Sequence, residues 1–279
     1  MKRIVILFTV HQLMNPKVLV LTGYGINCEE ETQFAFESAG ATAEVVHVND
    51  LIDGIKKLSD YQIFALPGGF SYGDDTGSGN ALANRIRNHL WEQVMNFIQN
   101  DQHLVIGICN GFQMLVNLGA LPALNGEYGM RQVALLDNES ARFLNRWVDV
   151  EFKAKGPWIG NGMTFSMPIA HGEGRLTAPQ ETIDAIRQKG LIAATYVSGK
   201  ICAYQNLPAN PNGSVENIAG LVDESGRILG LMPHPERALK FTNAPNWTLK
   251  REQLKRAGRP IPEYGDGIQI FKNAVEYYQ

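Results

Sequence analysis

The chain has 279 residues, of which 44% are hydrophobic and 19% are charged, and its formal net charge is −3. This composition is typical of a globular protein with a sizeable core, and the slightly acidic balance gives no electrostatic basis for binding nucleic acid. The three cysteines, Cys28, Cys109 and Cys202, form neither a disulfide framework nor a CxxC metal motif, which favours a reducing compartment, the cytoplasm.

The first thirteen residues, MKRIVILFTVHQL, differ in character from the rest of the chain. The basic start and short apolar run are similar to a signal peptide, but they lack a small-residue cleavage site, and the run is too short to span a bilayer. Met14 directly precedes NPKVLVLTG, the first core strand. We therefore expect residues 1–13 to be an N-terminal extension or a mis-assigned start, and residues 14–279 to form one domain.

Apolar runs and helical patterns alternate in the first 120 residues. Strands are predicted at 17–23, 43–48, 61–69 and 103–108. Helices are predicted from a capping box of Asn27 and Glu30 to Gly40, and over 80–99 and 110–119. Continuous apolar strands that alternate with helices indicate a parallel sheet covered on both faces.

The second half is richer in strand patterns and loops. Strands are predicted at 146–152, 163–171, 191–197, 201–206 and 228–234. A turn region at 206–214, an irregular and partly basic stretch at 240–260 and a final helix at 267–278 complete the chain. The whole pattern predicts an α/β fold, a three-layer sandwich around a central, mostly parallel sheet.

Cys109 lies in LVIGICNGFQML, where an apolar strand turns directly into a helix. Gly107 and Gly111 flank it at −2 and +2, the spacing found around the serine of a nucleophile elbow. The free N–H groups and dipole of the following helix favour a thiolate there. A buried structural cysteine is the alternative. Cys28 precedes three glutamates that oppose a thiolate, and Cys202 lies in an apolar run, so both are interpreted as structural.

A nucleophilic thiol needs a base, and two His-x-Glu stretches compete for that role. They are His234-Pro235-Glu236 and His171-Gly172-Glu173. Residues i and i+2 of an extended segment share a face, and proline fixes the backbone where glycine loosens it, which favours His234 with Glu236. A hydrogen-bonded loop histidine remains the alternative for either one.

The stretch LPGGFSYGDDTGSGNA, residues 66–81, comes directly after a predicted strand. It has neither the lysine nor the spacing of a phosphate loop, so a substrate-shaping loop that provides an oxyanion donor from Gly69 explains it better. Asn110 N–H, at the helix start, is a second candidate donor. GYGINC, residues 23–28, does not complete a dinucleotide fingerprint, and no histidine, cysteine or carboxylate pattern indicates a metal.

Together, LPGGFSYGDD, GICNGFQML and MPHPER resemble the class I, triad-type glutamine amidotransferases. Further similarity, in DNESARFLNRW, PIAHGEGR, NPNGS and YGDGIQIFKNAVEYY, is greatest to the glutaminase subunits of phosphoribosylformylglycinamidine synthase and extends from about Asn15 to the C-terminus. The resemblance implies a flavodoxin-like topology and a glutamine amidotransferase type 1 domain over 14–279.

The same resemblance implies roles for individual residues. Cys109 would attack the side-chain amide of L-glutamine to give a thioester and ammonia, with His234 as the base and Glu236 as its orienting carboxylate. The other implied residues are Gly69 and Asn110 as oxyanion donors, and Phe70, Gly111 and Gln113 as the lining of the glutamine pocket.

The implied partners are a synthetase subunit and a small accessory subunit. The synthetase uses ATP, with Mg²⁺, to convert formylglycinamide ribonucleotide to its amidine in purine biosynthesis, and this chain itself needs no cofactor. Its departures from the family pattern are the extension 1–13, small residues in the loop after Asp75, and unusual segments near 176–190 and 240–260. The surface with Arg142, Phe143, Arg146 and Trp147 either contacts a partner or packs on a strand face.

Two other functions stay open on the residues alone. A stand-alone cysteine hydrolase of γ-glutamyl or peptide bonds would keep the chemistry and need no partner. A thiol sensor or binding module on the same fold would show oxidation of Cys109 without a trapped thioester.

Overall fold

The computed structural model describes residues 15–153, 156–160 and 162–279. The expectation for residues 1–13 lies outside these ranges. The strands are β1 (Lys17–Thr22), β2 (Thr42–His47), β3 (Ile63–Leu66), β4 (Leu104–Ile108), β5 (Ala134–Asp137), β6 (Leu144–Phe152), β7 (Thr164–His171), β8 (Glu173–Thr177), β9 (Ile192–Val197), β10 (Ile218–Val222) and β11 (Ile228–Leu231).

The helices are α1 (Glu29–Ser38), α2 (Val48–Ile52), α3 (Asn80–His89), α4 (Trp91–Gln99), α5 (Asn110–Leu118), α6 (Gln180–Gln188), α7 (Lys200–Gln205), α8 (Trp247–Arg256) and α9 (Ile268–Glu276). Short 3₁₀ turns include η2 (Ser71–Asp74), η5 (Pro235–Arg237) and η6 (Phe241–Asn243).

One sheet runs through the described chain in the order β2-β1-β3-β4-β11-β10-β9-β6-β7. The first five strands are mutually parallel, and each later neighbour is antiparallel to the one before. Only β10 and β6 therefore run against the rest, which confirms the mostly parallel sheet. A separate pair, β5 and β8, forms a small antiparallel ribbon.

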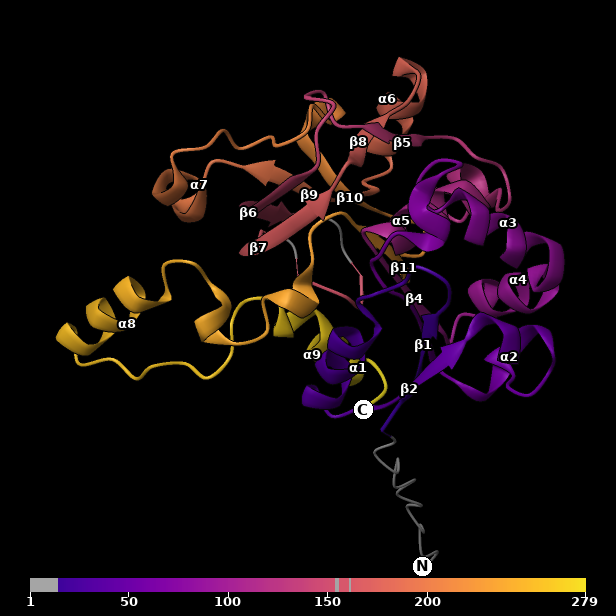
Figure 1. The fold of residues 1–279 in the computed structure, drawn as a ribbon, viewed down its shortest axis with the longest axis horizontal. Coiled ribbons are helices and arrows are strands. Elements are labelled where there is room, and N and C mark those ends of the chain that lie inside the picture. The colour runs from indigo at the N-terminus through magenta and orange to yellow at the C-terminus, as the bar shows by residue number, and fades with distance from the viewer. Residues whose placement is uncertain (1–14, 154–155, 161) are drawn as a thin grey trace, which may run out of the picture.

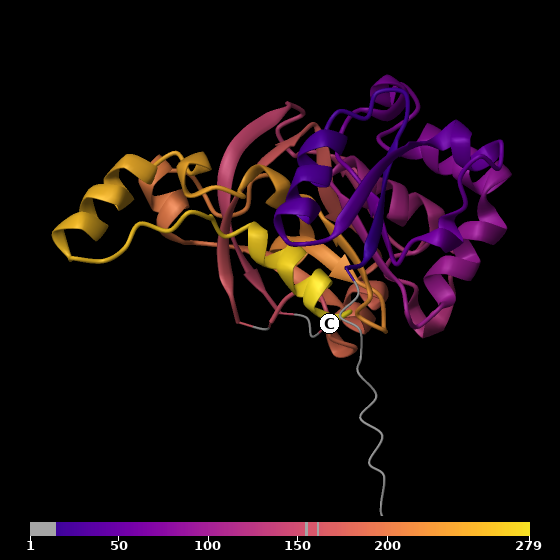
Figure 2. The same ribbon diagram turned by 90° about the horizontal axis from the view of Figure 1, so that it is seen from below.

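Helices cover both faces of the parallel part, as Figures 1 and 2 show. The connection from β1 to β2 moves along the sheet in one direction and that from β3 to β4 in the other, so right-handed crossovers put α1 opposite α3 and α4. Phe271 of α9 meets Phe36 of α1 edge to face, with ring centroids 4.9 Å apart, while α5 packs under β3, β4 and β11. The three-layer arrangement is confirmed.

The register fixes where the site forms. Ile108, the last residue of β4, pairs with Leu231, the last residue of β11. Cys109 follows β4 directly, and His234 follows β11 after two residues. Both side chains consequently leave the sheet at its carboxyl edge, where open α/β sheets bind their ligands.

The predicted helix over 80–99 is wrong in one respect, because it is two helices that meet at Leu90. Leu90 has φ −125° and ψ 8°, outside the helical range. The apolar stripe that suggested one helix is nevertheless buried along both, with Ile86, Leu90 and Val94 all inside. The helical period of the apolar residues was predicted correctly, but this period gives no sign of the break in the backbone at Leu90.

Other local predictions were wrong as well. Residues 201–206 lie in the helix α7 and the turn that ends it, not in a strand, and residues 240–260 contain the helix α8. The capping box of Asn27 and Glu30 is absent, since Cys28 is the N-cap of α1 and its side chain makes no capping bond. The strands β5, β8 and β10 and the helix α6 had no sequence prediction.

Candidate active site

Cys109 lies at a sharp bend between β4 and α5, with φ 52° and ψ −105°. Few non-glycine residues adopt a positive φ, and such strained positions collect at functional sites. The Cys109 N–H donates to Leu231 O at 2.7 Å, which ties the bend to β11. A Cβ on Gly111 would lie 1.8 Å from Leu66 O, and one on Gly107 2.5 Å from Gly111 O, so both flanking positions need glycine.

The Cys109 sulfur is mostly covered but not enclosed by apolar groups alone. The residue is 4% exposed, and its Sγ lies 3.7 Å from Ala170 O. It stands at the N-terminus of α5, whose first amides have no partner within the helix. The helix begins where the sequence predicted it, and the role of Cys109 as a nucleophile stays a prediction.

His234 and Glu236 form a buried pair beside this bend. His234 Nδ1 lies 2.5 Å from Glu236 Oε1, and both residues are at most 3% exposed. The backbone N–H of His234 donates to Pro168 O at 2.8 Å, so β7 holds the backbone at His234 in place. The other ring nitrogen, Nε2, has no hydrogen-bond partner among the described residues.

The charges around His234 favour its protonated form. Burial alone lowers the pKa of the imidazole, but the Glu236 carboxylate and the neighbouring sulfurs of Cys109 and Cys28 hold the pKa well above its usual value. An imidazolium next to a thiol that loses its proton is the arrangement of a cysteine activated by a histidine.

The competing pair does not form. His171 Nδ1 lies 3.0 Å from Asn138 Oδ1, and the Glu173 carboxylate instead accepts from the Ser78 N–H at 3.1 Å. Burial, together with the charge of His234, lowers the pKa of His171 to about 3. The ring is therefore neutral at ordinary pH and has no carboxylate to orient it.

Sequence reasoning missed the position of Cys28. Its sulfur accepts from Arg237 Nη2 at 2.9 Å, and potential ligand atoms of Cys28, His234 and Glu236 all lie within 4.8 Å of one another. Burial raises the pKa of this thiol, so it is protonated and a poorer nucleophile. A signal was available, because GYGINC follows β1 and the carboxyl ends of neighbouring parallel strands meet. Cys202 lies elsewhere, in α7, with its Sγ 3.8 Å from the carbonyl oxygen of Val197 at the end of β9.

The structure also brings together three side chains that could bind a metal ion. The cluster of Cys28, His234 and Glu236 has side chains of the types that bind zinc, although no sequence spacing indicated one. Glu236 Oε1 is already the partner of His234 Nδ1, whereas Glu236 Oε2 and His234 Nε2 have no hydrogen-bond partner among the described residues.

The two implied oxyanion donors come from different segments, Asn110 from the start of α5 and Gly69 from the loop after β3. Asn110 is the first residue of α5, where the N–H has no helical partner. Gly69 pairs with Ile26 in an isolated antiparallel bridge. The bonds of that bridge come from Phe70 N–H to Gly25 O and from Asn27 N–H to Gly68 O. The Gly69 N–H therefore points away from Ile26 and takes no part in the bridge.

The residues implied for the glutamine pocket differ in their exposure and in their hydrogen bonding. Phe70 is 40% exposed, and its ring lies 5.9 Å from that of Phe143. Gly111 is buried under β3, against Leu66 O. The side chain of Gln113 is fully engaged, because its Nε2 donates to Glu173 O and its Oε1 accepts from Asn110 Nδ2 at 2.9 Å.

Asn110 and Gln113 thus hold the loop that follows β3. Asn110 Oδ1 accepts from the Ser71 N–H at 3.3 Å, and its Nδ2 lies 3.3 Å from Asp74 Oδ1. Burial, and the nearby charge of Glu173, raise the pKa of Asp74. A small cavity of about 130 Å³ lies beside this network, lined partly by Gln113 and Glu173.

The surface considered for partner contact is mixed. Arg146 donates to the carbonyls of Pro208 and Ala209, and Trp147 exchanges two backbone hydrogen bonds with the side chain of Gln205. These two residues therefore pack within the chain. Phe143, in contrast, is 52% exposed.

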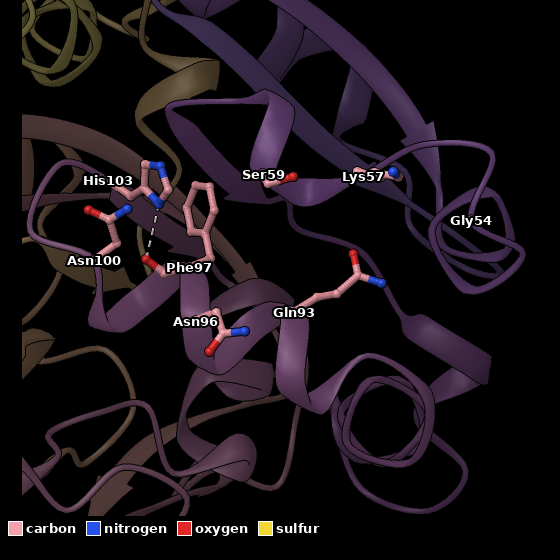
Figure 3. A pocket seen from close by; sticks show the side chains of 8 residues that line it. All are labelled: Gly54, Lys57, Ser59, Gln93, Asn96, Phe97, Asn100 and His103. Atoms are coloured by element: carbon pink, nitrogen blue, oxygen red, sulfur yellow. Dashed lines mark hydrogen bonds between the residues drawn. The ribbon is translucent and has the colours of Figure 1, made fainter.

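A cavity of about 430 Å³ lies at the opposite edge of the sheet (Figure 3). His103, which lines it, directly precedes β4, whereas Cys109 directly follows that strand. The His103 ring stacks on Phe97 with centroids 4.0 Å apart, and burial lowers the pKa of its imidazole. This cavity holds none of the residues of the candidate site.

Within the described residues, no helix combines the length and the apolar character needed to cross a membrane.

A cysteine on a strand-to-helix bend, with a buried His–Glu pair at the carboxyl edge of a mostly parallel sheet, is the arrangement of a class I glutamine amidotransferase. Comparison with known proteins agrees. Residues 15–278 match the family described as the CobB/CobQ-like glutamine amidotransferase domain.

Curated relatives and a solved structure give the narrower group. Phosphoribosylformylglycinamidine synthase subunit PurQ of Methanococcus maripaludis is 49% identical over 268 residues, 95% of this chain and 99% of that protein. The same subunit of Dehalococcoides mccartyi is 41% identical, over 94% and 97% of the two chains. A chain in the structure of PurLQS from Thermotoga maritima is 29% identical, with a TM-score of 0.68 over 95% of this chain and all of that one. The chain therefore belongs to the CobB/CobQ-like glutamine amidotransferase family, and within it to the PurQ glutaminase subunits of phosphoribosylformylglycinamidine synthase.

Proposed function

We propose that this subunit hydrolyses L-glutamine at Cys109 and passes the ammonia to a synthetase partner for amidine formation in purine biosynthesis. The observation that carries the proposal is the gathering of Cys109 and the buried His234–Glu236 pair at one edge of the sheet, in a chain of the PurQ family. Residues 14–279 act in it as one glutamine amidotransferase type 1 domain.

In the first half of the reaction, the proton of the Cys109 thiol passes to His234, whose protonated form the surroundings favour, and the sulfur attacks the side-chain amide carbon of glutamine. The N–H groups of Gly69 and Asn110 stabilise the oxyanion. His234 then returns the proton to the leaving nitrogen, which departs as ammonia and leaves a thioester on Cys109.

In the second half, His234 removes a proton from a water molecule that attacks the thioester carbonyl. The same amides stabilise the second oxyanion, and the sulfur leaves as glutamate forms. One glutamine and one water give one glutamate and one ammonia. Glu236 keeps the imidazole oriented and its charge balanced throughout.

The partner performs the rest of the synthesis. We assign ATP and Mg²⁺ to the synthetase subunit and no cofactor to this chain, and we expect a small accessory subunit in the complex. The PurLQS structure supports an assembly with a PurL partner for this family. The three free cysteines fit a reducing compartment, and we place the reaction in the cytoplasm.

The test measures glutamate release by the chain alone and with its synthetase partner. We expect weak hydrolysis alone and a clear rise with the partner. Cys109→Ser should lower hydrolysis by about 10³-fold or more and abolish trapping by an electrophilic glutamine analogue. Cys202→Ser, a thiol far from the bend, is the matched control and should keep both. Normal turnover by Cys109→Ser would refute the assignment.

A substrate panel separates the alternative hydrolase. Activity on γ-glutamyl peptides that equals activity on glutamine, with no response to the synthetase, would favour a stand-alone enzyme. Peroxide oxidation of Cys109 with no trapped thioester would favour a thiol sensor.

A further inference from the structure

The helix α8 projects from the body of the molecule in both ribbon views (Figures 1 and 2). None of its ten residues is buried, and its main packing contact is with η6, the turn just before it. A helix this short is marginal on its own in water, because helix nucleation is costly. Contact with another molecule on the face toward α7 would therefore stabilise this helix.

Part of the lining on that face is apolar. Leu249 and Leu254 of α8, together with Tyr204 of α7 and Phe241 of η6, line a groove of about 590 Å³, which we call the α7–α8 groove. Leu249 is 50% exposed and Tyr204 is 53% exposed. Single exposed apolar residues are ordinary, but several around one groove mark a site where another molecule binds.

Other lining residues of the groove are basic. Lys200, Lys250 and Arg259 belong to its lining. The segment 247–259, WTLKREQLKRAGR, has five basic residues and one acidic residue, whereas the whole chain has 25 basic and 28 acidic ones. Of these five basic residues, only Arg256 forms an ion pair among the described residues, with Glu252. The unpaired positive charge calls for an acidic occupant.

The two ends of this projection meet on the catalytic segment. Lys240 pairs with Tyr264 in an isolated bridge, and the Gly265 N–H donates to Leu239 O at 2.7 Å. The Gly267 N–H donates to Ala238 O at 3.1 Å, and a Cβ at this glycine would lie 2.1 Å from Pro235 O. The projection is thus attached to the short stretch of chain that includes Glu236.

We propose that the α7–α8 groove docks an acidic segment of the synthetase subunit, with an apolar side chain seated between Tyr204 and Leu249. A protein segment fits better than a nucleic acid or an anionic membrane, because the lining combines apolar with basic side chains and the chain as a whole is negative. We choose the synthetase as the partner for two reasons. The projection is joined directly to the segment that includes Glu236, and the synthetase uses the ammonia released at that site. This inference rests on the proposed function.

The test measures the dissociation constant between the purified chain and the synthetase subunit, with the accessory subunit present. Leu249→Asp changes an apolar lining residue of the groove, and Lys250→Glu changes a basic one. We expect each to weaken binding by tenfold or more, and the effect of Lys250→Glu to shrink as salt is raised. Arg256→Glu makes the same charge reversal on α8 outside the groove lining and should stay within twofold.

Trapping by the glutamine analogue separates the two proposals. The free Leu249→Asp and Lys250→Glu chains should label at Cys109 as fast as the unaltered chain, and their melting temperatures show that they are folded. If the unaltered chain does not label, the proposed function fails, whatever the binding result.

If all chains label and the groove variants bind the synthetase with unchanged affinity, the docking proposal is overturned. It is also overturned if the groove variants instead abolish self-association, or binding to anionic vesicles or duplex DNA, while synthetase binding persists.

Discussion

Two glycines allow Cys109 to occupy its strained bend. Gly111 lets α5 begin directly against the carbonyl of Leu66, and Gly107 lets the strand pass under that helix. This close approach, more than the cysteine itself, explains why the GxCxG spacing carries information. A side chain at either glycine must move the helix away from the sheet.

Gly111→Ala tests this requirement. The new methyl would lie 1.8 Å from Leu66 O, so we expect the free energy of unfolding to fall by about 3 kcal/mol and glutamine hydrolysis to be lost. Gly172→Ala is the control, because a Cβ there meets nothing within 4 Å. Chemical denaturation and glutaminase assays measure both effects. Equal stability of the two variants would contradict the argument.

His234 carries a second prediction, on pH. Burial opposes its charge, but Glu236 and the two sulfurs leave its pKa well above the usual value. A raised pKa in the folded state means that the protonated ring stabilises the fold below the unfolded pKa of about 6.5. That contribution is lost as pH rises through the folded pKa.

Glu236→Gln removes the charge that contributes most to the increase in this pKa. We expect the alkaline limb of kcat/KM for glutamine to move to lower pH, and kcat to fall by about 10²-fold or more. Glu173→Gln is the matched control, because that carboxylate pairs with Ser78 and not with an imidazole. An alkaline limb that stays in place in Glu236→Gln would show that Glu236 does not set the pKa.

At the scale of elements, α7 shows how a neighbouring strand decides a local structure. Asp149 of β6 accepts hydrogen bonds from the N–H groups of Ile201 and Cys202, each at 3.0 Å, and its other oxygen accepts from Ser166 Oγ at 2.7 Å. The carboxylate caps a helix from outside it. Gly199 provides the room, since a Cβ there would lie 2.4 Å from the carboxyl carbon.

Asp149→Ala leaves two buried amides of α7 without a partner. We expect the free energy of unfolding to fall by about 2–3 kcal/mol, since hydrogen bonds to a charged group are involved. Asp149→Asn keeps an acceptor and should cost about 1 kcal/mol. Asp184→Ala, which breaks an exposed ion pair with Arg187, should leave the denaturation midpoint nearly unchanged. Denaturation midpoints that rank these variants otherwise would contradict the capping role.

At the scale of the whole molecule, one continuous core supports a projection that contributes little to it. The nine-stranded sheet and its helices enclose the buried side chains, while α8 buries none. The two ends of the projection lie side by side at the bridge of Lys240 and Tyr264.

Replacing residues 244–262 by a short glycine-serine loop should therefore leave the body intact. We expect the melting temperature to change by about 5 °C or less and the labelling of Cys109 to persist, because a loop of similar reach closes the same ends. Affinity for the synthetase should fall at least as far as in Leu249→Asp. Calorimetry and titration measure both quantities, and collapse of the fold on deletion would contradict the separation of body and projection.

The sequence by itself determined the class of fold, the positions of the first four strands along the chain and the bend at Cys109. Those features depend on local patterns: apolar runs of strand length, a helical period, and glycines at −2 and +2 of a cysteine. Recognition of several motifs in order also indicated the family, which the comparisons confirmed.

Only the tertiary structure decided which residues meet. In the tertiary structure His234 pairs with Glu236, whereas His171 pairs with Asn138. The register of β4 and β11 brings His234 to the bend. The tertiary structure also placed Cys28 beside the imidazole, where β1 ends near its neighbours, and made α7 a helix through a carboxylate about fifty residues earlier in the chain. A local pattern of apolar residues cannot predict contacts between residues far apart in sequence, since each contact depends on the order of the strands in the sheet.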